Sequence, residues 1–247
     1  MKILVCVSKT PETTAKISFN DDLTEFNGTG VQYIMNPYDE WYALVKGLEL
    51  KETAGAGTVS IINVGLAEND AVIRKGLAIG ADDAVRVDAN PQSALFVAKQ
   101  ITAYAKEENF DCILLGKETI DYNGAEVGAM IAELLDLPYI SFGTDMKVAD
   151  GKATISRDIE GGTEVVEVNT PVVVSSAKGM AEQRIPNMRG IMMAKRKPLK
   201  VIPAVATEDL AKVVSYTLPQ AKSEVKMVDP ESMDELVRLL NEEAKVL

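Results

Sequence analysis

The segment from Gly116 to Gly128 holds the residues of this sequence that are best suited to binding chemistry. Turn-forming residues occupy Asp121 to Gly124, and a helix-like run begins at Ala125. The first turn of a helix leaves backbone N–H groups without partners and carries the positive end of the helix dipole, an arrangement that suits phosphate. The same residues are also typical of a plain helix cap and a tight turn, so both interpretations stay open.

Three further segments resemble this one because each lies at the end of an apolar run or at the start of a helix-like run. They are Val7 to Lys9, Asn36 to Asp39, and Val64-Gly65. Loops so far apart in the chain can bind one ligand only if the fold brings them to one edge. The fold therefore has to be inferred next.

Short aliphatic runs alternate with segments of helical period through the first half of the chain. We expect alternating strands and helices at Lys2–Val7, Tyr38–Lys51, Val59–Val64, Asn69–Ile79, Ala84–Val87, Gln92–Lys106, Asp111–Leu115 and Ala125–Leu135. This pattern is typical of an α/β fold with a doubly wound, mostly parallel sheet. Right-handed crossovers place the carboxyl ends of all such strands at one edge, where these sheets bind ligands. The sequence thus predicts that the four loops meet there.

The second half of the chain changes to shorter extended segments separated by glycine turns. We expect antiparallel hairpins from Asp145–Ala149, Lys152–Asp158, Thr163–Val168 and Pro171–Ser176, and an amphipathic helix at Glu231–Lys245. We divide the chain into an α/β nucleotide-binding domain at 1–182, a basic segment at 183–200, and a C-terminal arm at 201–247. The arm has little apolar core of its own, so we expect it to wrap a partner.

Composition excludes several classes of function. The 26 Lys and Arg residues against 37 Asp and Glu give a net charge of −11, which disfavours nucleic acid as a partner. The absence of histidine removes Ser-His, Cys-His and His-metal sites, so we expect no catalytic side chain and no metal. Cys6 and Cys112 lie inside apolar runs, which indicates reduced core residues. No apolar stretch approaches the roughly 18 residues of a bilayer span, so we expect a cytoplasmic protein without membrane insertion.

Two common nucleotide fingerprints are missing. Ser8 to Pro11 stand where a Rossmann fold carries GxGxxG, and no GxxxxGK[ST] occurs in the chain. A standard NAD site and a P-loop ATPase are therefore disfavoured. An ATP-consuming adenylating enzyme is disfavoured as well. Such an enzyme needs a loop of glycine and serine residues after the first strand to bind phosphate, and this chain has no such loop there.

Five strings, taken together and in order, resemble the electron transfer flavoprotein β-subunit family. The similarity extends from about residue 2 to about residue 200, and the combination is specific although each string alone is weak. The strings are Ile34 to Asp39, Gly80 to Asp82, Leu114 to Asp121, Arg157 to Gly162, and Gly190 to Lys197.

The resemblance implies a subunit that pairs with an α subunit, which carries the electron-transferring FAD, and that binds an adenine nucleotide at the predicted edge. The nucleotide is FAD in the bifurcating branch, where NADH is the electron donor, and structural AMP in most other members. Val127 before Gly128 resembles the bifurcating branch. We expect the Glu126 carboxylate to point away from a phosphate, because like charges repel. The implied nucleotide contacts are Cys6, Asn36, Pro37, Tyr38, Asp39, Val64, Gly116, Lys117, Asp121, Tyr122, Asn123, Gly124, Ala125, Glu126 and Val127.

The basic segment from Gln183 to Lys200 carries six basic residues, no acidic one, and interleaved methionine and isoleucine. Flexible thioethers beside cations make an adaptable docking surface. The resemblance implies that this segment binds a flavin-dependent dehydrogenase, with Met188 as the apolar anchor and Arg184, Arg189 and Met192 around it. It also implies that Asp158 contacts the mobile flavin domain of the α subunit. Two alternatives stay open: a non-bifurcating β subunit with structural AMP, and a stand-alone nucleotide-binding regulator.

Overall fold

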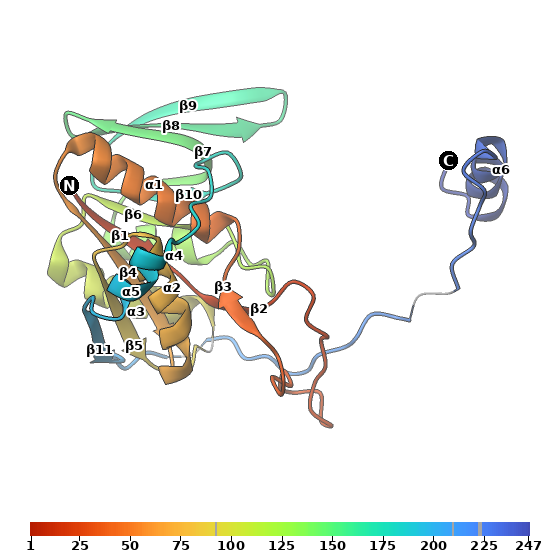
Figure 1. Ribbon diagram of the computed structural model, residues 1–247, viewed down its shortest axis with the longest axis horizontal. Helices are drawn as coiled ribbons and strands as arrows, with labels where there is room; N and C mark the ends of the chain where they lie inside the picture. Colours follow the sequence, from red (N-terminus) through yellow and green to blue (C-terminus); the bar gives the residue numbers. More distant parts are fainter. Residues whose placement is uncertain (92, 209, 222–223) are drawn as a thin grey trace. The chain divides into compact units, whose positions relative to one another are not determined.

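The computed structural model describes residues 1–91, 93–208, 210–221 and 224–247, and within them it contains a nine-stranded sheet and a separate two-stranded sheet (Figure 1). The strands are β1 Lys2–Cys6, β2 Lys9–Pro11, β3 Tyr33–Met35, β4 Thr58–Gly65, β5 Asp83–Asp88, β6 Cys112–Gly116, β7 Tyr139–Ala149, β8 Lys152–Ile159, β9 Gly162–Asn169, β10 Val172–Ser176 and β11 Leu199–Pro203. The order in the large sheet is β11-β5-β4-β1-β6-β10-β7-β8-β9. Strands β11 through β7 are parallel, and β7, β8 and β9 form an antiparallel meander.

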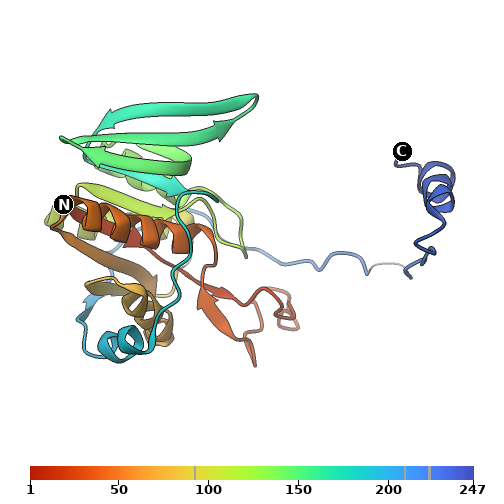
Figure 2. The ribbon, with the colours of Figure 1, turned by 45° about the horizontal axis from the view of Figure 1, so that its top comes forward.

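Helices cover both faces of the parallel part. They are α1 Asp39–Ala54, α2 Asp70–Ile79 after the short 3-10 turn Ala67–Asn69, α3 Ala94–Glu108, α4 Val127–Leu135 and α5 Met188–Ala194. One apolar core joins alternate strand residues such as Ile3 and Val5 to α1 and α2, and the other joins residues such as Leu4 and Cys6 to α3 and α4. Because successive side chains of a strand point to opposite faces, the aliphatic runs feed both cores. Figure 2 shows α1 lying along one face of the sheet.

The connections create a switch in direction between β1 and β6. From β1 the chain crosses to β4 and then to β5, whereas from β6 it crosses the other way through α4 to β7. In open α/β sheets the loops that leave such neighbouring strands in opposite directions frame the ligand site outside the carboxyl strand ends. The expected doubly wound, mostly parallel α/β fold is therefore confirmed, and its topology singles out one place on its edge.

Three features differ from the sequence-based expectation. The segment Pro171–Ser176 was expected in an antiparallel hairpin, but β10 pairs in parallel with both β6 and β7, because β9 leads back to the amino edge of the sheet. Strand β11 and helix α5 were not predicted. Strand β11 is a short edge strand that contains Lys200 and ends in Pro203. Helix α5 has only seven residues, one of which is Gly190. Neither element therefore has a clear periodic pattern of apolar residues.

The described residues group into two compact units. The first contains Met1–Ile17 and Asn27–Val214, and the second contains Ser18–Phe26 and Ser215–Leu247. In the second unit the Phe19 ring stacks on Tyr216 with centroids 4.5 Å apart, and the Leu23 carbonyl accepts a hydrogen bond from the Tyr216 N–H at 2.7 Å. This unit also holds α6, Met233–Arg238, which continues as a π-helical turn over Leu239–Glu243.

Two of the expected helices differ in extent from the observed ones or begin outside the described residues. The expected helix at Glu231–Lys245 is confirmed in its middle part only, and the expected start of another helix at Gln92 lies outside the described residues. None of the helices in the described part of the chain is both long and apolar enough to cross a membrane.

Candidate functional site

Three chain segments converge where β1 and β6 end. They are Val7-Ser8 after β1, Asn36 to Glu40 at the start of α1, and Gly116 to Val127 between β6 and α4, and we call them together the carboxyl rim. Backbone pairing places β1 beside β6, and hydrogen bonds between side chains and the backbone tie the other segments to them. The predicted meeting of these loops is therefore confirmed for the segments that follow β1 and β6.

Asn36 joins two of the rim segments to each other. Its side chain is fully buried, its Nδ2 donates to the Glu118 carbonyl at 2.9 Å, and its Oδ1 accepts from the Ile120 N–H at 3.0 Å. Its own backbone N–H donates to the Ser8 carbonyl at 3.1 Å. The amide side chain thus uses both its nitrogen and its oxygen for hydrogen bonds inside the protein.

Glu40 joins the third segment to this framework. Its carboxyl group is buried and accepts the Ser8 backbone N–H at 2.7 Å and the Ser8 hydroxyl at 2.5 Å. A Cβ at Gly116 would lie 2.9 Å from Glu40 Cγ and 3.0 Å from the Glu40 backbone nitrogen, so only glycine lets β6 end this close to α1. The first turn of α1 is therefore packed directly against the end of β6.

The carboxyl groups of the first turn of α1 have unusual protonation behaviour. Burial raises the pKa of Glu40 to about 8, with Asp121 and Asp39 adding to the effect and the Ser8 hydrogen bonds opposing it. Burial also raises the pKa of Asp39 to about 6, and the nearby Lys117 opposes that rise. Two carboxyl groups that lose charge easily reduce the repulsion an anionic ligand would meet at this edge.

The loop from Asp121 to Val127 carries the hydrogen-bond donors. In the described part of the chain, no group accepts a hydrogen bond from the backbone N–H of Gly124, Ala125 or Glu126. The first turn of α4 adds further N–H groups with no intrahelical partner. The Glu126 side chain is exposed and makes no capping hydrogen bond. Asn123 and Ala125 adopt positive φ angles of 50° and 52°.

Tyr38 and Pro37 lie between Asn36 and the first turn of α1. Tyr38 has φ 63° and ψ −93°, a backbone conformation that residues other than glycine rarely adopt, and 54% of its surface is exposed. Backbone strain of this kind is concentrated at ligand sites and switch regions. The exposed ring at the start of α1 makes Tyr38 a candidate contact for an aromatic base.

Cys6 and Val64 line the buried side of this edge. Cys6 is the last residue of β1, Val64 is the next-to-last residue of the neighbouring β4, and both are buried. Burial raises the pKa of the Cys6 thiol well above its usual range, so this thiol stays protonated. Asn63 Nδ2 donates to the Val7 carbonyl at 2.8 Å, and Asn69 Nδ2 donates to Asn63 Oδ1 at 2.9 Å, which fixes the turn after β1.

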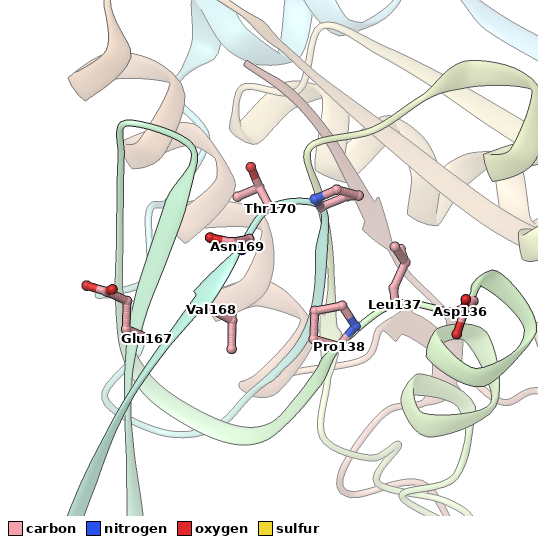
Figure 3. A pocket seen from close by; sticks show the side chains of 8 residues that line it. Asp136, Leu137, Pro138, Glu167, Val168, Asn169 and Thr170 are labelled. Carbon is pink, nitrogen blue, oxygen red and sulfur yellow. The ribbon is translucent and has the colours of Figure 1, made fainter.

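A surface depression lies elsewhere, at the amino ends of β7 and β10. Figure 3 shows Glu167 and Asp136 on opposite sides of it, with Val168, Asn169 and Pro138 between them. The Glu167 carboxylate pairs with Lys152 Nζ at 2.6 Å, and the lining contains acidic and neutral residues without a cation. The charge of this lining disfavours phosphate, whereas the carboxyl rim combines backbone donors with Lys117, so we place the candidate site at the rim.

The basic segment presents an apolar surface on α5. Met188 is 74% exposed and Met192 is 67% exposed, and Ile185 lies just before them. A second depression beside them is lined by Arg184, Arg189 and Met193, among others. Arg184 is held by α1, because its guanidinium donates to both carboxylate oxygens of Glu52 at 2.7 and 2.9 Å.

Hydrogen bonds join α2 and the turn after it to the end of α5 and to the turn that follows α5. Lys197 Nζ donates to the carbonyls of Leu77, Gly80 and Ala81, and Arg74 Nη1 donates to those of Ala194 and Lys197 at 2.7 Å. A Cβ at Gly190 would lie 2.4 Å from the Ala78 carbonyl oxygen. The exposed methionines therefore stand on a rigidly held helix.

Asp158 lies exposed near the end of β8. The neighbouring Arg157 does not pair with it: Arg157 Nε donates to Glu164 at 2.5 Å across the β8–β9 hairpin, and Nη1 donates to Ser141 Oγ at 3.0 Å. The Asp158 carboxylate accepts a long hydrogen bond from the Thr163 hydroxyl at 3.4 Å.

Sequence reasoning missed Glu40, and it missed the hydrogen bonds by which Asn36 holds Glu118 and Ile120. Glu40 directly follows Asp39 in the first turn of α1, so its position beside a predicted edge loop was the available signal. The partners of Asn36 had no local signal, because they lie 82 and 84 residues away in the chain. In the described part of the chain no three potential ligand side chains group as a metal site.

Comparison with known proteins gives a consistent picture. A model of the electron transfer flavoprotein domain matches residues 25–207. The chain is 38% identical over 224 residues to the electron transfer flavoprotein subunit beta of Syntrophomonas wolfei, an alignment that covers 90% of this chain and 88% of that protein. Identity to the subunit beta of Bacillus subtilis is 33% over 261 residues with complete coverage of both. Identity to the human subunit beta is 31% over 256 residues, covering 100% of this chain and 99% of that protein.

Proposed function

Since the chain belongs to the electron transfer flavoprotein β-subunit family, we propose that it binds an adenine nucleotide at the carboxyl rim and acts as one subunit of a two-subunit electron carrier. The observation that supports this most is the set of unpartnered backbone N–H groups between Gly124 and Val127. They stand beside the switch between β1 and β6, where sheets of this kind bind nucleotides.

The donor set fits the phosphate of such a ligand. Backbone N–H groups at a helix start bind phosphate oxygens without a counter-charge, and Lys117 adds a cation that also pairs with Glu118 at 3.1 Å. The exposed Tyr38 ring offers a face for adenine. Cys6, Asn36 to Asp39, Val64, and the residues from Gly116 to Val127 remain the proposed lining of the site.

We favour FAD over AMP as this nucleotide, because Val127 precedes Gly128 as in the bifurcating branch. A bound flavin would supply hydride and single-electron transfer, whereas AMP would be a structural ligand. The protein's part in either case is to bind the phosphate, orient the nucleotide and exclude water with the apolar ends of β1 and β4. NADH would be the electron donor in the FAD form.

The proposed partners are an electron transfer flavoprotein α subunit and a flavin-dependent dehydrogenase. The relatives are named as β subunits, which supports an α subunit as the first partner. Exposed methionines on the rigid helix α5 support a docking surface for the second, with Met188 as its anchor, and Asp158 remains the proposed contact to the α subunit. The free, buried thiols of Cys6 and Cys112 favour a reducing compartment, which we propose is the cytoplasm.

Counting flavins tests this function. The chain would be co-expressed and purified with its α subunit, saturated with FAD, and analysed for FAD and AMP released on denaturation, followed by titration with NADH. Two FAD molecules per pair and direct reduction by NADH support the FAD form. One FAD plus one AMP supports the structural form. A stable monomer without nucleotide would refute both and favour a stand-alone protein.

A further inference from the structure

Asn36 occupies a position that a simple ligand contact does not explain. It is fully buried, and its backbone N–H donates to the Ser8 carbonyl. Its side-chain amide donates one hydrogen bond to the Glu118 carbonyl and accepts one from the Ile120 N–H. We propose that Asn36 is a positioning residue, which holds the loop between β6 and α4 in the geometry that its nucleotide donors require. This inference rests on the proposed function.

The first step of the argument is that Asn36 spans three segments. Its backbone N–H reaches Ser8 after β1, its Nδ2 reaches Glu118, and its Oδ1 reaches the Ile120 N–H. A side-chain amide has both a donor and an acceptor at fixed separation, so it can bind a carbonyl and an N–H of one loop at the same time. Buried backbone groups left without these partners would be costly.

The second step connects the held residues to the donors. The Asn123 N–H donates to the Thr119 carbonyl at 2.9 Å, which closes a helical turn that begins between the two contacts of Asn36. Gly124 to Glu126 follow directly. The unpartnered N–H groups therefore extend from a turn whose start Asn36 fixes.

The third step is that the support under Asn36 is itself rigid. Glu40 binds the Ser8 N–H and hydroxyl, and Gly116 packs against the first turn of α1 too closely for any other residue. Asn36 thus links the loop between β6 and α4 to the closely packed part of the rim. Donors fixed before the ligand arrives bind it without an ordering cost, which is the advantage of a preorganised site.

The test uses two variants and a matched control in the full chain, purified with its α subunit. Asn36→Asp keeps the acceptor for Ile120 but places a carboxylate oxygen against the Glu118 carbonyl. Ile120→Pro removes the N–H that Asn36 accepts while leaving Asn36 intact, and proline is tolerated at the first position of a helical turn. The control is Gln100→Glu: Gln100 is buried and bridges the N–H and carbonyl of Val205 at 2.8 and 2.9 Å with the same amide chemistry, far from the rim.

The measurements are FAD and AMP affinity, and amide hydrogen exchange over residues 117–128 without added nucleotide. We expect both rim variants to bind about tenfold more weakly and to exchange faster in this loop, because the donors lose their fixed geometry. Gln100→Glu is expected to leave both quantities within about twofold of the unchanged chain.

Each contrary result has a distinct meaning. Unchanged affinity in both variants would overturn the positioning role while leaving nucleotide binding intact. Lost affinity with unchanged exchange in Asn36→Asp, together with normal binding by Ile120→Pro, would show that Asn36 touches the nucleotide directly and would also overturn it. If the unchanged chain bound neither FAD nor AMP, the proposed function would fall, and this inference with it.

Discussion

Glu40 shows how a single residue combines structure with charge regulation at the rim. Its carboxyl group satisfies two donors of Ser8, yet burial raises its pKa to about 8. The neutral form is therefore the common one near neutral pH in the folded protein. This arrangement avoids a buried charge beside the proposed phosphate site.

The stability of the protein should depend on pH through Glu40. The pKa is higher in the folded state than in the unfolded state, so folding takes up a proton between the two values. The stabilising contribution is complete below about pH 4.5 and is lost as the pH rises through about 8. We expect the free energy of unfolding by urea to fall by up to about 1.4 kcal/mol per pH unit between pH 6 and 8 from this group, and Glu40→Gln to flatten that slope.

The window from pH 6 to 8 separates Glu40 from Asp39, whose raised pKa is about 6. Glutamine keeps an acceptor for the Ser8 N–H and offers a donor to the Ser8 hydroxyl, so the local geometry survives. Equal slopes for the unchanged chain and Glu40→Gln across this window would contradict the assignment.

We expect the strained backbone of Tyr38 to lower the stability of the protein, and the Tyr38 ring to strengthen nucleotide binding. Its φ of 63° and ψ of −93° store strain of about 1–3 kcal/mol, which glycine relieves at a smaller entropic cost. We expect Tyr38→Gly to unfold at a temperature equal to or above that of the unchanged chain and to bind nucleotide more weakly, as measured by calorimetry. Tyr38→Ala is the matched control, since it removes the ring and keeps the strain. An equal gain in stability from both variants would show that the ring, and not the backbone, is the source.

At this scale the sequence predicted which loops meet better than what each residue does. Asn36 was expected as a nucleotide contact because of its place at a strand end. The structure adds that its amide is committed to Glu118 and Ile120, which no local pattern reveals. Hydrogen bonds between residues more than eighty positions apart depend on the whole fold.

Helix α5 is the element on which the proposed dehydrogenase contact depends. Gly190 faces the end of α2, where a Cβ would lie 2.4 Å from the Ala78 carbonyl oxygen. We expect Gly190→Ala to lower the free energy of unfolding by about 1–3 kcal/mol, because the backbone oxygen cannot move aside as a flexible side chain would. Gly162→Ala on β9, with no heavy atom within 4 Å of the added group, should change it by no more than about 0.5 kcal/mol. Similar effects of the two substitutions in urea denaturation would refute this packing.

Met188 should matter for partner binding and little for folding. Its side chain is 74% exposed on α5 and packs against little of the protein. We expect Met188→Ala to weaken electron transfer to the dehydrogenase about tenfold at limiting concentration, with unchanged nucleotide content. Val165→Ala is the control, because Val165 is 64% exposed on β9 and lies outside the basic segment. Unchanged transfer in Met188→Ala would remove Met188 as the anchor.

Elements were predictable where burial imposes a pattern. Strands β1, β4, β5 and β6 are mainly aliphatic because helices cover both of their faces, and the sequence located all of them. The predicted antiparallel pairing of β10 was wrong, since β10 pairs in parallel with β6 and β7. A five-residue strand carries no information on whether its neighbours run parallel to it. Short elements at the surface, such as β11 and α5, gain their structure from β5 and α2 and not from their own periodicity.

The whole molecule consists of a doubly wound sheet with a switch at β1 and β6, an antiparallel extension, and a second unit made of Ser18–Phe26 and Ser215–Leu247. The contact of Phe19 with Tyr216 inside that unit joins an early loop to the beginning of the C-terminal segment. Sequence alone could not foresee this pairing, since nearly two hundred residues of the sheet domain separate the two rings in the chain. The charge and the topology together support the carboxyl rim as the candidate site for an anionic ligand.

The central claim is that main-chain amides between Gly124 and Val127 hold the phosphate of an adenine nucleotide beside the ends of β1 and β6. A crystal structure of the chain with its α subunit, grown with FAD or AMP, measures this directly. We predict phosphate oxygens about 2.7–3.2 Å from these backbone nitrogens, with Glu126 turned away. A nucleotide found in the depression at the amino ends of β7 and β10, or bound only by the α subunit, would contradict the account.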